Sequence, residues 1–143
     1  MDELVKYLLL IAFVFLAFFL WDLHVKVQGP QTGIEGFETL KPVDWMLTAS
    51  GDFTLLVRNR DASLLEITAA TADVRVGGGQ CALKNSLPSE TLKQHEYIFL
   101  NFTDCRITRQ KGEYSKVNVS LDYRKYSSGE TGRSEGVIWG PLQ

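Results

Sequence analysis

The chain has 143 residues and a formal net charge of −2, with 22% charged and 45% hydrophobic residues. This balance leaves no basic face, so composition gives no electrostatic case for a nucleic-acid partner. The length allows an N-terminal stem of about 30 residues and one domain of roughly 110, near the small end for a single hydrophobic core.

An unbroken apolar run, residues 7–21, lies close to the N-terminus. A helix that is apolar on all sides has no face for water, so the run must be buried in a bilayer or in an assembly of chains. A basic n-region and a small-residue cleavage site are both missing, which argues against a cleavable secretory signal. Its fifteen residues cover about 22 Å as a helix, so spanning a hydrocarbon core of about 30 Å also needs the flanking apolar residues.

Signals at both ends of this run set the limits of the helix. Asp2 stands four residues before Lys6, a spacing that stabilises a helix when the acid comes first. Gly29-Pro30 ends the helix, because proline cannot continue the hydrogen-bond ladder. The predicted helix covers residues 2–27, and the predicted domains are a stem of 1–30 and a head of 31–143.

Aromatic side chains are dense in the stem. Large rings supply area and shape to tightly packed helix–helix contacts, which favours an assembly over a plain lipid anchor. The aromatic residues are Tyr7, Phe13, Phe15, Phe18, Phe19 and Trp21. The side chains that we expect to pack in the core of an assembly are Leu8, Ile11, Phe15, Phe18, Phe19 and Trp21.

From Ile34 onward the hydrophobic pattern is typical of strands. The predicted strands are Phe53–Arg60, Leu64–Val76, Tyr97–Phe102, Cys105–Thr108, Tyr114–Tyr123 and Val137–Trp139, the last reached through a turn at Ser127–Gly132. Within the second strand, one side of the pleat is expected to carry Ile67, Ala69, Thr71, Asp73 and Arg75. Strand signals spaced by about 8 to 15 residues, without a helical period, predict a small immunoglobulin-like sandwich. The fold class predicted for the chain is therefore α+β.

The run Gly77-Gly78-Gly79 invites comparison with phosphate-binding loops. Such loops lead from a strand into a helix and carry a Lys-Ser/Thr or dinucleotide pattern, which is absent after Gly79. We therefore interpret the run as a turn or an inter-subunit loop.

Cysteines and sequons suggest a location outside the cytoplasm. Cys81 and Cys105 are 24 positions apart, and such a pair in a small extracytoplasmic domain usually forms a disulfide, with two buried free thiols as the alternative. The sequons that start at Asn101 and Asn118 predict N-glycosylation at those two residues.

Catalytic and metal-binding patterns are not found in the sequence. The only histidines are His24, in the stem, and His95, in a polar segment. Nucleophile-elbow and zinc-protease motifs are absent, and no cysteine or histidine spacing completes a four-ligand metal set. We therefore predict a protein that is not an enzyme and that uses no cofactor and no metal.

A hydrophobic N-terminal helix joined to a β-sandwich head resembles archaeal type IV pilins and archaellins, the subunits of archaeal surface filaments. Cys105–Tyr123 and Glu135–Pro141 are also similar to the last part of immunoglobulin-like heads in archaeal surface proteins. The resemblance implies a filament with helices in its core and heads outside. Many pilins have a glutamate at position 5 that contacts a neighbour's amino terminus; this chain has Val5, and the resemblance assigns that contact to Glu3.

Three hypotheses follow. The first is a structural subunit of an extracellular helical filament, built from identical subunits, with adhesive heads compatible with it. In this hypothesis the stem anchors each subunit in the membrane before assembly. The alternative is a single-pass membrane-anchored accessory subunit of a membrane complex, with its β domain outside the cytoplasm. A third class, a monomeric ligand-binding or adhesive domain on a tether, fits the exposed loops.

Overall fold

The computed structural model describes residues 2–28, 32–87 and 91–143, with the side chains of 23–28 left out. The chain divides into two compact units, Met1–Gln31 and Thr32–Gln143, one residue beyond the predicted boundary. We call them the stem and the head and describe each by itself.

The stem is one helix, α1 (Asp2–Gln28), which confirms the predicted helix and extends it by one residue. Its first turn carries Asp2 and Glu3, whose negative charges are favourable at a helix N-terminus. Lys6 pairs with Glu3, at 3.8 Å between nitrogen and oxygen, rather than with Asp2. The predicted stop at Gly29-Pro30 lies outside the described residues.

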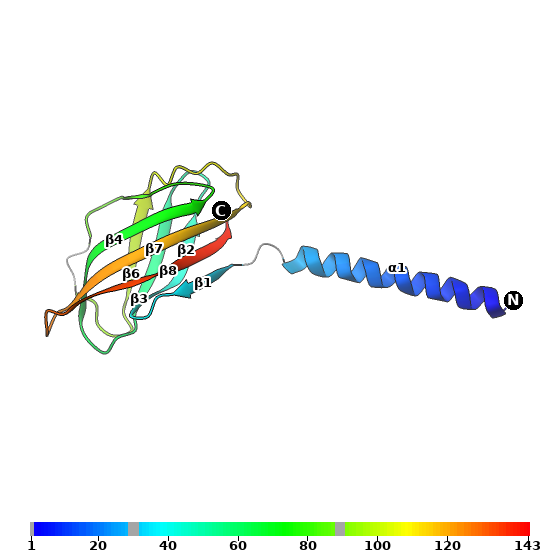
Figure 1. The fold of residues 1–143 in the computed structure, drawn as a ribbon, viewed down its shortest axis with the longest axis horizontal. Coiled ribbons are helices and arrows are strands. Elements are labelled where there is room, and N and C mark those ends of the chain that lie inside the picture. The colour runs from blue at the N-terminus through cyan, green and yellow to red at the C-terminus, as the bar shows by residue number, and fades with distance from the viewer. Residues whose placement is uncertain (1, 29–31, 88–90) are drawn as a thin grey trace. The chain divides into compact units, whose positions relative to one another are not determined.

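The head is a sandwich of two four-stranded antiparallel sheets (Figure 1). Its strands are β1 (Gly33–Gly36), β2 (Leu40–Leu47), β3 (Phe53–Asn59), β4 (Leu65–Val76), β5 (Ala82–Leu83), β6 (Tyr97–Thr103), β7 (Tyr114–Lys125) and β8 (Thr131–Pro141). Sheet I has the order β1-β8-β7-β4, and sheet II has the order β2-β3-β6-β5. The predicted α+β fold with a β-sandwich is confirmed.

The connections between the sheets are those of an immunoglobulin-like sandwich. The chain crosses from sheet II to sheet I between β3 and β4 and again between β6 and β7. As a result β3 pairs with β6 in one sheet, while β4 pairs with β7 in the other. This Greek-key arrangement of two central pairs is the one that immunoglobulin domains use.

The core lies between the inner faces of the two sheets. Alternate residues of β3, namely Phe53, Leu55 and Val57, are fully buried, and the Phe53 ring packs 5.8 Å from the ring of Phe102 on β6. The buried polar side chains of Asn59, Ser115 and Ser134 are hydrogen-bonded, as burial requires, whereas the buried Nε of Arg58 has no partner among the described residues. The Ser134 hydroxyl on β8 donates to the Leu40 carbonyl on β2 at 2.8 Å and so links the two sheets.

A β-bulge in β4 changes which residues face the core. Pairing with β7 passes from Ile67 directly to Ala69, so Thr68 is left out of the ladder and the pleat reverses phase. Ile67 is buried before the bulge, whereas Ala72 and Val74 are buried after it. The predicted single face of Ile67, Ala69, Thr71, Asp73 and Arg75 is therefore wrong, because Thr71 and Arg75 are exposed.

The predicted strand at Cys105–Thr108 is also wrong. This segment forms part of the crossing from β6 to β7 and has no strand geometry. Asp104 and Arg106 have positive φ angles, 55° and 53°, which a β-strand does not accommodate. The strand-like composition is explained instead by burial, since Cys105 is fully buried and Ile107 packs against the core.

The glycine run forms a tight turn that leads from β4 towards β5. Gly77 has a φ of 86°, and the Gly79 N–H donates to the Cys105 carbonyl at 2.8 Å. A Cβ atom on Gly78 would lie 2.8 Å from that carbonyl oxygen and 2.8 Å from Val74 Cγ1. The turn leads to a strand and not to a helix, which agrees with its interpretation as a turn and not as a phosphate loop.

This crowding gives a paired stability test. Gly78→Ala should lower the free energy of unfolding by about 1–3 kcal/mol, because backbone and a buried side chain must move to admit the methyl group. Gly79→Ala is the matched control, since its nearest atoms would be 3.6 Å away, at ordinary contact distance. Urea unfolding of both variants measures the difference, and equal midpoints would contradict the proposed crowding.

Candidate functional site

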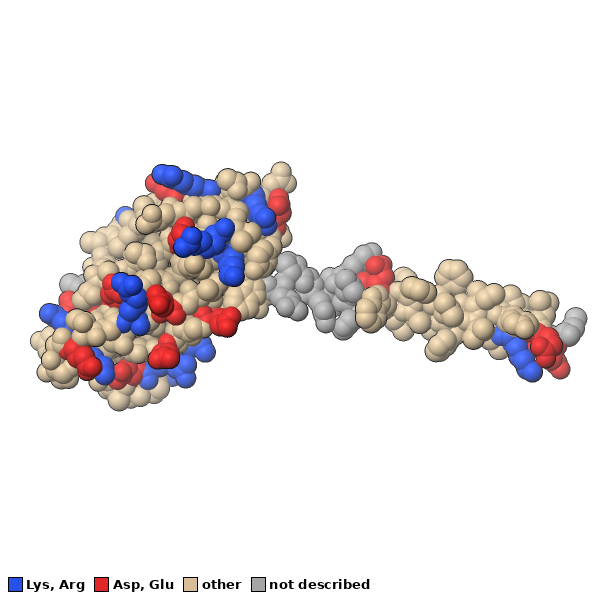
Figure 2. All heavy atoms as spheres, in the orientation of Figure 1, with Lys and Arg blue, Asp and Glu red and all other residues tan. Residues whose placement is uncertain are grey.

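The first candidate surface is the stem itself. Residues 2–22 of the helix are all exposed, and no charged side chain lies between Lys6 and Asp22 (Figure 2). Within the 21 residues Asp2–Asp22, a stretch of 18 residues has a mean hydropathy of 2.5, and the helix is long and apolar enough to cross a membrane. The predicted packing residues Leu8, Ile11, Phe15, Phe18, Phe19 and Trp21 are all between 51% and 72% exposed. The stem therefore requires an environment other than water.

One side of the stem carries an apolar hollow. It measures about 350 Å³ and is lined by Phe13, Val14, Ala17, Phe18 and Trp21. Four of these residues stand at i, i+3, i+4 and i+7 from Val14, the spacing of a hole that receives one side chain from a neighbouring helix. The small Ala17 forms the floor, and larger side chains surround it. The hollow therefore has the form of a helix-packing contact.

The outer face of sheet I is polar. Ion pairs cross it between neighbouring strands, from Arg133 to Asp122 at 2.7 Å and from Arg124 to Glu66 at 2.6 Å. The hydrogen bond and the charge of Asp122 raise the pKa of Arg133 above its ordinary value. A face with these pairs is well suited to contact with water.

The outer face of sheet II carries apolar residues instead. Met46 and Phe99 are exposed by 47% and 62%, and Leu56 on β3 is paired with Phe99 and diagonal to Met46. We call these three residues the apolar stripe. They line a shallow hollow of about 200 Å³ together with Asp44, Trp45 and Thr54. Next to the stripe, the Arg58 guanidinium lies over the Tyr97 ring at 5.8 Å.

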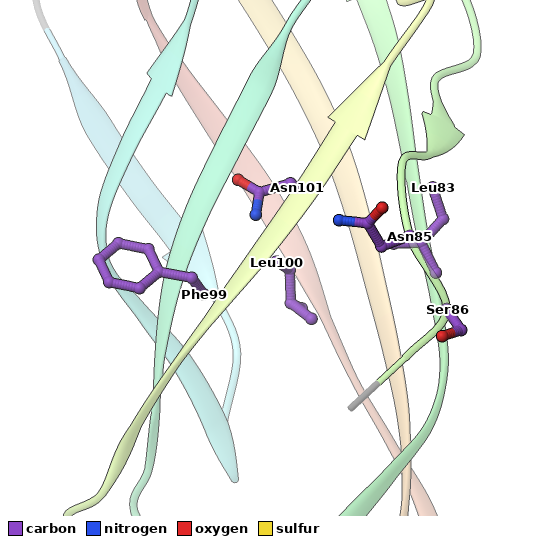
Figure 3. Close-up of a pocket in the computed structure, with 6 residues that line it drawn as sticks. All are labelled: Leu83, Asn85, Ser86, Phe99, Leu100 and Asn101. Atoms are coloured by element: carbon purple, nitrogen blue, oxygen red, sulfur yellow. The ribbon is translucent and has the colours of Figure 1, made fainter. Parts of the chain in front are cut away.

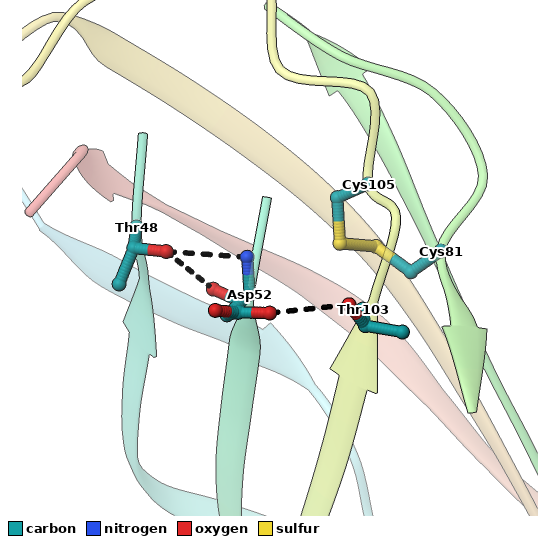
Figure 4. Close-up of a disulfide and its surroundings, with 5 residues drawn as sticks. All are labelled: Thr48, Asp52, Cys81, Thr103 and Cys105. Atoms are coloured by element: carbon teal, nitrogen blue, oxygen red, sulfur yellow. Dashed lines mark hydrogen bonds between the residues drawn. A yellow bond between two sulfur atoms is a disulfide. The ribbon is translucent and has the colours of Figure 1, made fainter. Parts of the chain in front are cut away.

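The predicted disulfide is present. Cys81 precedes β5 and Cys105 follows β6, so the bond closes the end of this strand pair (Figure 4). Beside it, Asp52 accepts a hydrogen bond from the Thr103 hydroxyl at 3.2 Å. Antibody domains instead join the strands that correspond to β3 and β7 across the sandwich. A disulfide hints at an oxidising compartment, and with the apolar helix it suggests a membrane anchor or signal and an extracellular location.

The two predicted glycosylation residues occupy different surroundings. Asn101 is exposed on the outer face of β6, and its Oδ1 accepts a hydrogen bond from the Thr54 hydroxyl at 3.3 Å. Asn118 is half-buried on β7, a central strand of sheet I, opposite Asp73 on one side and Val137 on the other. The structure thus places the two sequons on opposite outer faces of the sandwich.

The remaining predicted residues do not form a site. Glu3 pairs with Lys6, and the side chain of His24 lies outside the described residues. His95 is exposed, and its Nδ1 accepts a hydrogen bond from Arg58 at 2.6 Å. Among the residues that the structure describes, no group of three or more His, Cys, Asp or Glu side chains has the arrangement of a metal site.

Comparison with known proteins gives no family assignment. No protein-family model matches the chain, and a search of curated proteins finds no match. The layout of an apolar N-terminal helix followed by a β-sandwich is compatible with a pilin-like subunit. Arguments about function therefore rest on the surfaces described above.

Sequence reasoning missed the apolar stripe and the hollow at Ala17. The stripe depends on β2, which was not predicted, because Pro42 and the shift in pairing between Pro42 and Asp44 interrupt its alternation. The sequence does contain a signal that Leu56 and Phe99 face outward. Leu56 lies on the same strand face as Arg58, and Phe99 lies on the same strand face as Asn101. Counting alternate positions from the buried residues of each strand would have placed Leu56 and Phe99 on the outer face.

The disulfide gives a second stability test. Cys81→Ala/Cys105→Ala should lower the free energy of unfolding by about 3 kcal/mol, since it frees a loop of 24 residues in the unfolded chain. Chemical unfolding of the parent chain and of the variant measures the loss. Reductant should reproduce the loss in the parent chain and leave the variant unchanged; a parent midpoint that is insensitive to reductant would contradict the prediction.

Proposed function

We propose that the chain is a structural subunit of an extracellular helical filament, in which stems pack into an apolar core and heads cover the outside. The observation that carries the proposal is the stem, which is apolar on every side and carries a hole for a neighbouring side chain. The partners are identical subunits, and no ligand is required for the assembly.

The energy of assembly comes from burial of the stem. Each large apolar side chain that leaves water contributes roughly 1.5–3 kcal/mol. In α1 the side chains from Leu8 to Leu20 are apolar without interruption. Since no side is polar, a single helix pair leaves apolar surface exposed, whereas a stem surrounded by several others buries all of it. This favours a many-stranded core over a closed dimer.

The head is suited to the outside of such an assembly. Ion pairs cover sheet I, and the disulfide stabilises a domain that works outside a reducing cytoplasm. Contacts between copies that do not close on themselves generate filaments. Before assembly the same stem would hold the subunit in the membrane, and the Glu3–Lys6 pair would lie at its end.

The proposal is tested by negative-stain electron microscopy of material sheared from the surface of cells that produce the chain, with mass spectrometry of the main band. Filaments composed of this chain support the proposal. A chain recovered only from the membrane fraction, in a fixed ratio to other proteins, contradicts it.

Phe15→Asp should abolish filaments, because a charge in the apolar core lacks both water and a partner. Phe15 is 72% exposed on the stem, and the stem and head are separate units, so the head should keep its fold. Phe15→Leu is the matched control and should assemble. Microscopy gives the readout, with circular dichroism to check the head; normal filaments from Phe15→Asp would refute the core packing.

Ala17→Leu tests the hole. Three added carbon atoms fill the hollow at Ala17 and should exclude the neighbour's side chain, which reduces filament yield or length. The control is Ala12→Leu, the same change on the same helix at a residue that does not line this hollow. Counting filaments by microscopy decides between them, and an equal effect of both changes would mean that the hole has no specific role.

A second candidate is a single-pass membrane-anchored subunit of a membrane complex. It is favoured by the length of the candidate span, since the 21 residues Asp2–Asp22 at 1.5 Å rise per residue cover about 31 Å, the thickness of a hydrocarbon core, with the long Lys6 side chain extending its charge to the interface. Extraction in mild detergent distinguishes the two candidates. A stoichiometric complex of different chains supports the anchored subunit, and a polymer of this chain alone supports the filament.

A further inference from the structure

The sequon of Asn101 lies beside the apolar stripe on the outer face of sheet II. Phe99, Asn101 and Thr103 alternate along β6 and point to the outer face of sheet II, while Leu100 and Phe102 between them are 2% and 1% exposed. Phe99 belongs to the apolar stripe. The strand therefore presents an aromatic ring and an acceptor asparagine on one face, two residues apart.

The amide of Asn101 is available on this face. Its Oδ1 accepts from the Thr54 hydroxyl at 3.3 Å, and within the described residues its Nδ2 makes no hydrogen bond. In Figure 3, Asn101 and Phe99 extend to the same side of β6. A shallow hollow of about 200 Å³, lined by Leu83, Asn85, Ser86, Phe99, Leu100 and Asn101, adjoins the amide. That volume is below the usual range for small-molecule pockets.

The other sequon lacks the aromatic neighbour and is less exposed. Asn118 is half-buried on β7, and its cross-strand neighbours are Asp73 and Val137. No aromatic ring lines the surrounding hollow, which is formed mainly by polar residues such as Thr71, Arg75 and Glu135. A sugar at this position would gain little from the surface beneath it.

We propose that Asn101, and not Asn118, carries an N-linked glycan, and that its first sugar packs against the Phe99 ring and covers the apolar stripe. One face of a pyranose ring presents C–H groups, which pack against the electron-rich face of an aromatic ring as another ring's edge does. The attached sugar would also cover the Phe99 side chain, which is 62% exposed.

The attachment requires a sugar linked to a lipid phosphate or diphosphate, and a separate membrane transferase. The Asn101 Nδ2 forms a bond to the anomeric carbon and loses one proton. The bond from that carbon to the phosphate oxygen breaks, and the lipid phosphate leaves with its electron pair.

The choice of site is tested by mass spectrometry of glycopeptides. The full chain, with Asn101→Gln and Asn118→Gln as matched variants, is produced in cells that N-glycosylate secreted proteins and is purified in detergent. We expect the parent and Asn118→Gln to carry sugar at Asn101, and Asn101→Gln to carry none. Sugar at Asn118 in any of the proteins, or at neither site in the parent, would overturn the proposal.

The packing on Phe99 is tested by thermal unfolding of the full chain in detergent, with the sugar trimmed to one residue and without it. The sugar should raise the midpoint of the parent by a few degrees and that of Phe99→Ala by none. Tyr97→Ala is the control, since Tyr97 is 55% exposed on the same strand but farther from Asn101, and should keep the rise. An equal rise in Phe99→Ala, or no rise in the parent, would refute the contact. Both readouts concern single chains, so their failure leaves the filament proposal untouched.

Discussion

The need to remove the stem from water governs everything else about this protein. An amphipathic helix would satisfy half of its surface with solvent and half with its own head, but α1 has no polar side to offer. The head already has a complete core between its two sheets, so it has no use for the stem in its own folding. The burial partner must therefore be a bilayer or other chains, and the two choices correspond to the two candidate functions.

The head combines one polar and one apolar outer face. Sheet I is stabilised in water by cross-strand ion pairs, and sheet II carries the apolar stripe. Such asymmetry means that the two faces meet different neighbours. A glycan attached within the stripe and a protein contact on the same face exclude one another, so the state of Asn101 decides whether sheet II is available for contacts between heads.

The sequence predicted the helix, the sandwich and the disulfide, because each depends on local composition or on a simple pairing. The errors have physical causes. The bulge at Thr68 reverses the alternation of inward and outward residues in β4. No residue type in that stretch indicates that one residue is left out of the pairing with β7. Cys105–Thr108 has the composition of a strand because Cys105 is buried and Ile107 packs against the core, yet positive φ angles at Asp104 and Arg106 prevent pairing. The stem hollow was missed because it depends on the contour between neighbouring side chains.

A load applied through the stem would reach strand β1 first, because of its place in the chain. It is the first element of the head after the stem, and four residue pairs join it to the end of β8. Any tension between an anchored stem and a head that is held from outside reaches this short strand before it reaches the core. The Ser134–Leu40 bond between the sheets and the pairing of β2 with β3 come next along the chain. Detachment of β1 would therefore lengthen the tether under load while the sandwich behind it stays folded.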